Sequence, residues 1–113
     1  MRSLEALSAY RKSAGHRSLR VQEADVFLQI NGVLRGAARA DAIDRTKALA
    51  DNERLWTAVM DLMRDPYNAL PPALRASILS VGFAVRREVA LAEPDFGFLI
   101  GINEQIAAGL AGR

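Results

Sequence analysis

The sequence contains no cysteine and only one histidine, His16, among its 113 residues. Without cysteine the chain has no disulfide bond, no thiolate nucleophile and no sulfur-based zinc site, and this composition suits a reducing compartment. His16 stands beside a glycine in a basic stretch, which is typical of a solvated loop residue rather than of a metal ligand. We therefore expect no metal site.

Sequence motifs that support catalysis or cofactor binding are also missing. The glycines are scattered and never precede a Lys-Ser or Lys-Thr pair, so the chain has no phosphate-binding loop. No serine or threonine lies in a strand–turn–helix elbow, where a nucleophile is usually held. Asp61 and Asp65 form an acidic pair on one helix face, but Arg64 and solvent are sufficient partners for them. We expect a protein that is not an enzyme and binds no cofactor.

Long apolar runs are absent as well. The run at residues 96–102 is far too short to cross a bilayer. The first residues contain no apolar core of the length that a secretory signal needs. These features predict a cytoplasmic protein without membrane insertion.

The net charge of +2 is distributed unevenly. Residues 1–20 hold the cations Arg2, Arg11, Lys12, Arg17 and Arg20 against a single anion, Glu5. The rest of the chain is therefore slightly acidic, whereas binding to duplex DNA needs several cations on one face of the folded body. We expect no DNA binding, and one domain over residues 1–113 in which residues 1–17 form a basic, mobile N-terminal segment.

Apolar residues recur at helical spacing along the chain, and no strand-like alternation competes with them. The spacing predicts a short helix over residues 4–13 and a second helix that starts from Ser18 as N-cap and ends near residues 36–40. A third helix is predicted from Asp41 to Arg64, a fourth from Pro72 and a fifth from Asp95. The stretches between these helices are short. The sequence thus predicts an all-α fold, a four- to five-helix bundle with short loops and largely antiparallel neighbours.

The third predicted helix carries an apolar seam with the spacing of packed helices. Its residues are Leu49, Asn52, Trp56, Val59 and Met63. Met60 widens this stripe, so the helix needs two neighbours, or one neighbour and a ligand. Trp56, Met60 and Met63 form either a core stripe or the wall of a groove for an amphipathic helix, because methionine side chains repack easily.

Asn52 and Asn103 are polar residues on otherwise apolar seams. A buried asparagine must find hydrogen-bond partners or costs about 1–3 kcal/mol. Two interpretations remain open: these residues fix the register of the helices, or they face a groove and bind a peptide backbone. The candidate partner-binding residues are Asn52, Trp56, Met60, Met63, Asn103 and, in the proline-rich hinge, Leu70.

Three short stretches occur in a family-specific order. They are LADNERLW at residues 49–56, NALP at residues 68–71, and IN at residues 102–103 followed by GL at residues 109–110. In these stretches the chain resembles the FlaF family of alphaproteobacterial flagellar proteins, and the resemblance covers nearly the whole chain. It implies a small cytoplasmic helical protein that binds flagellin as an export chaperone and regulates flagellin synthesis and secretion, alongside an FlbT-type partner.

The chaperone role is physically reasonable because unassembled flagellin has disordered amphipathic ends, whose apolar stripes a helical bundle can cover. The alternative is a post-transcriptional regulator that acts through RNA or an FlbT-type partner by way of the basic residues 2–20. Salt separates the two, because binding to an RNA backbone weakens steeply with salt.

Overall fold

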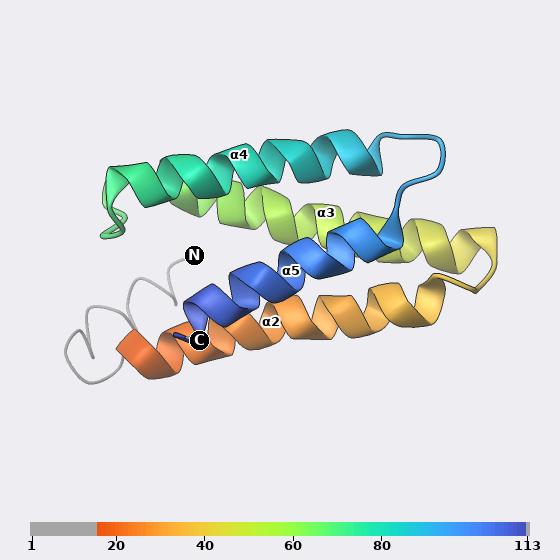
Figure 1. Cartoon of the computed structure of the whole chain (residues 1–113), viewed down its shortest axis with the longest axis horizontal. Helices are drawn as coiled ribbons and strands as arrows, with labels where there is room; N and C mark the ends of the chain where they lie inside the picture. Colours follow the sequence, from red (N-terminus) through yellow and green to blue (C-terminus); the bar gives the residue numbers. More distant parts are fainter. Residues whose placement is uncertain (1–15, 113) are drawn as a thin grey trace.

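The computed structural model describes the backbone of residues 16–112 and the side chains of residues 23–112. This part contains four helices and no strand: α2 (His16–Ala37), α3 (Ala42–Arg64), α4 (Pro72–Val89) and α5 (Phe96–Leu110). Consecutive helices run in opposite directions (Figure 1). The predicted all-α, antiparallel bundle with short loops is confirmed. The helix predicted over residues 4–13 lies outside the described residues, as does the basic segment up to residue 15.

Local sequence signals set most of the helix ends. Asp41 caps α3, and its Oδ1 accepts a hydrogen bond from the backbone N–H of Asp44 at 2.9 Å. Asp95 caps α5 in the same way, by accepting from the N–H of Phe98 at 3.1 Å. Pro72 occupies the first position of α4, where a missing N–H is harmless. These three helix starts agree with the prediction.

The predicted start of α2 is wrong. The helix begins at His16, so Ser18 lies inside it and is not the N-cap, and His16 is a helical residue rather than a loop residue. The reason is that neither His16 nor Arg17 breaks a helix, and the nearest helix-breaking residue in the sequence is Gly15. The predicted end of α2 near residues 36–40 is confirmed, since the helix ends at Ala37.

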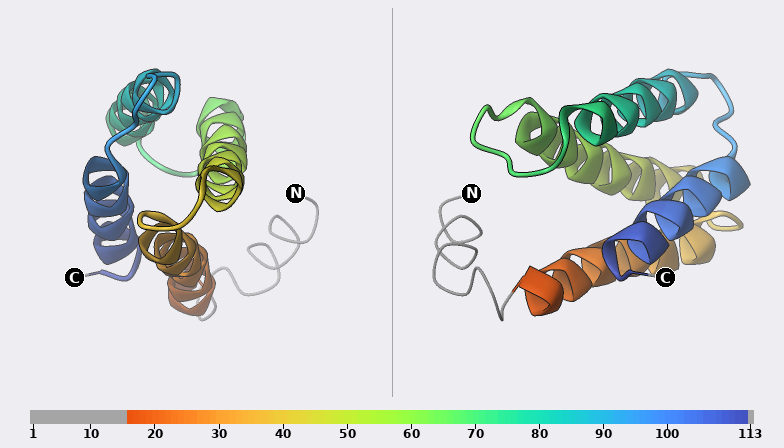
Figure 2. Two further views of the ribbon diagram at one scale, coloured as in Figure 1. Left: turned by 90° about the vertical axis from the view of Figure 1, so that its right-hand side faces the viewer. Right: turned by 60° about the vertical axis from the view of Figure 1, so that its left-hand side comes forward.

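The four helices form two antiparallel pairs. α5 packs along α2, and α3 packs along α4 on one side and along α2 on the other. α4 and α5 contact each other only sparingly. Figures 1 and 2 show why: α5 runs obliquely, and its C-terminal half leaves α4 and approaches α2. None of the described helices has the length and apolarity needed to cross a membrane.

The core is centred on Trp56, which has no exposed surface. The ring of Phe27 meets the indole edge-on, with 5.7 Å between the ring centroids. On the α4 side, Gly82 makes room for Met60. If residue 82 had a Cβ, that atom would lie only 2.6 Å from Sδ of Met60. This confirms the close approach of another helix that a glycine in the middle of α4 predicts.

The buried side of α3 is rotated slightly from the predicted seam. The buried residues of α3 are Ala48, Asn52, Trp56, Met60 and Met63. Leu49 and Val59, which were predicted to lie on the seam, are half-buried. The buried row follows the four-residue ridge of the helix because α3 packs between two neighbours rather than against one. On α4, the sequence spacing predicts a seam of Leu74, Ile78, Val81, Val85 and Val89. Val85 is buried, and Ile78, Val81 and Val89 pack against the core, but Leu74 is 45% exposed.

Candidate functional site

Five of the six predicted partner-contact residues lie in the interior of the bundle. Asn52, Trp56, Met60 and Asn103 have no exposed surface, and Met63 is 8% exposed. The sixth, Leu70, is half-buried in the turn between α3 and α4. This burial agrees with the interpretation of Trp56 as a core residue. Contact between these residues and a partner stays a prediction.

Three asparagines and Trp56 form one hydrogen-bond network inside the core. Nδ2 of Asn103 donates to Oδ1 of Asn52 at 2.8 Å and to Oδ1 of Asn31 at 3.0 Å. Oδ1 of Asn103 accepts from Nε1 of Trp56 at 2.8 Å. Nδ2 of Asn31 donates to the backbone carbonyl of Ile100 at 3.0 Å. The network joins α2, α3 and α5, and this arrangement suits the interpretation that the asparagines fix helix register.

The sequence reasoning missed Asn31, which is fully buried. It follows Phe27 by four residues and precedes Leu34 by three, and both of these are buried. Its place on a helical seam was therefore the available signal. Asn52 is the incomplete member of the network, because its Nδ2 is buried and has no hydrogen-bond partner among the described residues.

The turn between α3 and α4 is held by hydrogen bonds from two side chains. Nδ2 of Asn68 donates to the carbonyl of Leu62 at 2.8 Å, and Oδ1 of Asn68 accepts from the N–H of Leu70 at 2.8 Å. Nε of Arg75 donates to the carbonyl of Leu70 at 3.1 Å, and its guanidinium also reaches the carbonyl of Met63 at 3.4 Å. These bonds fix the direction in which α4 leaves α3. The NALP stretch thus has a structural role in the described chain.

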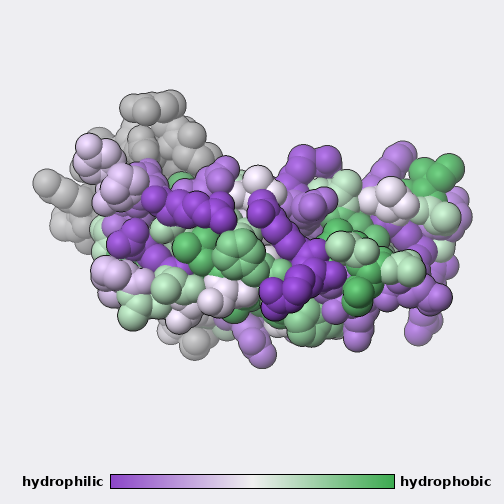
Figure 3. Space-filling view, turned by 90° about the horizontal axis from the view of Figure 1, so that it is seen from above, coloured by the Kyte–Doolittle hydropathy of each residue, from purple (hydrophilic) through white to green (hydrophobic). Residues whose placement is uncertain are grey.

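Large apolar side chains remain exposed on all four helices and in two of the loops. They are Val26, Leu28, Val33, Ile43, Tyr67, Leu74, Phe83, Leu91 and Phe98. Over α3 and α4, Figure 3 shows that apolar patches are interrupted by hydrophilic side chains. Arg64 lies over one of the exposed rings, with its guanidinium carbon 5.8 Å from the centre of the Phe83 ring. Single exposed apolar residues are ordinary, so the informative surfaces are those where several share one helix face.

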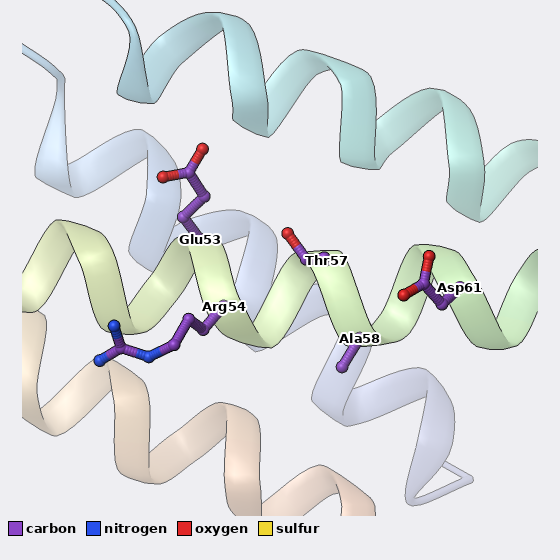
Figure 4. A pocket seen from close by; sticks show the side chains of 5 residues that line it. All are labelled: Glu53, Arg54, Thr57, Ala58 and Asp61. Atoms are coloured by element: carbon purple, nitrogen blue, oxygen red, sulfur yellow. The ribbon is translucent and has the colours of Figure 1, made fainter.

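A shallow depression lies on the surface of α3. Its lining residues are Glu53, Arg54, Thr57, Ala58 and Asp61. Figure 4 shows that all five come from this one helix and that Glu53, Thr57 and Asp61 follow one another along it. Among the side chains that the structure describes, those of residues 23–112, no group of three or more histidines and acidic residues is placed to hold a metal ion. The depression is an open helix surface rather than an enclosed site.

Comparison with known proteins identified one family. A family model described as "Flagellar protein FlaF" matches residues 6–110, which include all four described helices. Neither the curated proteins nor the solved structures that were compared with the chain gave a significant match.

Proposed function

Because the chain belongs to the FlaF family of flagellar proteins, we propose that it binds flagellin as an export chaperone in the cytoplasm and regulates flagellin synthesis and secretion. This role is one of binding rather than catalysis. The partner is an amphipathic terminal segment of flagellin, which is disordered before assembly and folds into a helix against the bundle.

The observation that carries this proposal is the apolar surface that remains on a bundle whose core is already filled. Trp56, Met60 and Leu99 close the interior, yet Phe98 and Leu74 stay 41% and 45% exposed. Apolar side chains that stay exposed on a folded bundle mark a protein-binding surface where they gather on one part of it. A client segment that must order itself on binding spends part of its interaction energy on that ordering, which keeps the complex releasable.

Co-expression with the flagellin of the same organism tests the proposal. We expect the two proteins to co-elute in size-exclusion chromatography at micromolar concentration and moderate salt, because apolar contacts are little affected by salt. A chain that elutes alone in the presence of excess flagellin contradicts the chaperone role.

The second candidate is a post-transcriptional regulator that acts through RNA or an FlbT-type partner. The cluster of cations within residues 1–20 favours it, and most of that cluster lies outside the described residues. Electrophoretic mobility shift of flagellin messenger RNA at 50 and 200 mM salt tests the RNA route. Binding that falls steeply with salt and disappears when residues 2–15 are deleted supports RNA recognition, whereas absence of a shift at low salt excludes it.

A further inference from the structure

Helix α5 is apolar around most of its circumference. Glu104 is its single charged residue, and it forms an ion pair with Arg35 of α2. A helix of such composition is normally covered on all sides. In the described chain, however, α5 packs closely along α2 and only sparingly against α4 (Figure 1). One side of α5 therefore lacks a neighbour among the described helices.

The uncovered side of α5 carries a second helical seam. The first seam is the buried row Leu99, Asn103 and Ala107. The second lies on the other side of the helix and consists of Phe98, Ile102, Gln105 and Gly109, at spacings of four, three and four. This alternation of three and four is the pattern by which one helix packs along another. We call these four residues, together with Gly101, the outer face of α5.

The outer face is uncharged, and part of it is open to close approach. Phe98 is 41% exposed, and Gln105 and Gly109 are exposed, whereas Gly101 is half-buried and Ile102 is half-buried against the core. A Cβ built on Gly101 or Gly109 meets no atom within 4 Å. Both glycines lower the stability of the helix, and the described chain packs nothing against them in return. They leave space for a second helix to approach the α5 backbone closely.

We propose that the outer face of α5 docks one amphipathic helix of flagellin through an uncharged stripe of that helix. This inference rests on the proposed function and names the surface that performs it. The outer face carries no charge, and Glu104 at its border is already paired with Arg35. A charged side chain buried against the face would therefore lose its hydration without compensation. The partner stripe is therefore apolar. The 15 residues of α5 span about 22 Å, the length of roughly four turns of a docked helix.

A second copy of this chain is the competing occupant, and the available area disfavours it. A helix face roughly 22 Å long and 10 Å wide is far smaller than the ~800 Å² per partner that a stable dimer buries. A disordered segment that folds against the face gains intrahelical hydrogen bonds as it docks. Its chaperone must also release it, so a small contact area is suitable for this occupant.

Two variants test the outer face without opening the core. Gly101→Leu places a bulky side chain in open space and replaces a poor helix former by a good one. Phe98→Glu places an acid in the first turn of α5, three residues after the N-cap Asp95, where it suits the helix dipole. We expect both variants to remain folded, with the thermal midpoint of Gly101→Leu at or above that of the parent chain.

Val33→Glu is the matched control. Val33 is 44% exposed and lies two residues, or about 200° around α2, from Arg35, the residue that pairs with α5. Isothermal titration of each full-length chain with the flagellin of the same organism measures the dissociation constant. We expect at least tenfold weaker binding for Gly101→Leu and Phe98→Glu, and less than a twofold change for Val33→Glu.

Three other results would contradict the docking site on α5 or the chaperone role. Parent-like binding by both α5 variants overturns the outer face as the docking site and leaves the chaperone role intact. Absence of binding by the parent chain overturns the chaperone role itself. If analytical ultracentrifugation shows a dimer of the parent chain that both α5 variants lose, the face is an interface between copies, and the proposal is also overturned.

Discussion

At the scale of single residues, Asn103 is the most consequential side chain of the bundle. It satisfies the indole N–H of Trp56 and the amide oxygens of Asn31 and Asn52, all inside the core. Asn52 contributes only an acceptor, and its own Nδ2 is unpaired among the described residues. The two asparagines have the same side chain and the same burial. Because Asn103 makes more hydrogen bonds than Asn52, we expect it to contribute more to the free energy of unfolding.

Replacement of each asparagine by leucine measures that difference. Asn103→Leu leaves one donor and two acceptors buried and unpaired, and we expect it to lower the free energy of unfolding by roughly 3 kcal/mol or more. Asn52→Leu leaves one N–H of Asn103 without its acceptor but also removes the buried, unpaired Nδ2 of Asn52. These effects offset each other, so we expect a change within about 1 kcal/mol. Urea denaturation followed by circular dichroism gives both values. Equal losses in the two variants would contradict this account of the network.

At the scale of elements, the helix ends were largely predictable from sequence and the buried faces only in part. Aspartate caps and prolines act through bonds within one turn, so Asp41, Pro72 and Asp95 mark their helix starts without any tertiary information. The apolar stripe of α3 is wider than the contact with a single helix, and the positions of α2 and α4 determine which of its residues are buried. This is why Met60 became a core residue while Val59 stayed half-buried.

The contact between α3 and α4 depends on the absence of a side chain at Gly82. A Cβ at this position would lie 2.6 Å from Sδ of the fully buried Met60, so the methionine side chain would have to shift within the core. We expect Gly82→Ala to destabilise the chain by about 1–3 kcal/mol, even though alanine is the better helix former by up to ~1 kcal/mol. Thermal denaturation measures the change.

A second substitution distinguishes steric conflict from loss of glycine itself. Met60→Ala alone creates a cavity and destabilises the chain, but in combination with Gly82→Ala it removes the conflict. The two substitutions are therefore expected to be less harmful together than the sum of their separate effects, by roughly 1 kcal/mol or more. Strict additivity would show that Met60 is not what Gly82 accommodates.

The candidate site was less predictable than the fold. Trp56, Met60 and Asn103 stood out in the sequence because they are large or polar on apolar seams, and the structure uses them inside the core. The outer face of α5 has no such signal, because Phe98 and Gly101 read as ordinary members of an apolar helix. Only the placement of α2 and α4 shows which side of α5 is left uncovered.

In the molecule as a whole, the four helices contribute unequally to the buried core. α2, α3 and α5 share the asparagine network and contribute most of the buried residues. α4 contributes only Val85 and Gly82 as fully buried positions, and it packs mainly on α3. The hydrogen bonds of Asn68 and Arg75 in the turn between α3 and α4 fix where α4 begins, but few α4 side chains are buried in the core.

Native-state hydrogen exchange tests this hierarchy. Amides in the middle of α4 are expected to exchange through openings of lower free energy than those in the middle of α2 and α5, because fewer buried contacts must break. The measurement is exchange at low denaturant concentration, resolved by residue. Equal opening free energies in all four helices would show that the bundle unfolds as a single unit.

The position of the single tryptophan has a spectroscopic consequence. Trp56 is the only indole of the chain, is fully buried and donates its N–H to Asn103. Its fluorescence emission therefore reports on the interior of the bundle without any added label. A partner that docks on the outside of α5 leaves the emission wavelength unchanged, whereas a partner that enters between the helices alters it. The chain thus carries an intrinsic optical probe that distinguishes surface recognition from rearrangement of the core.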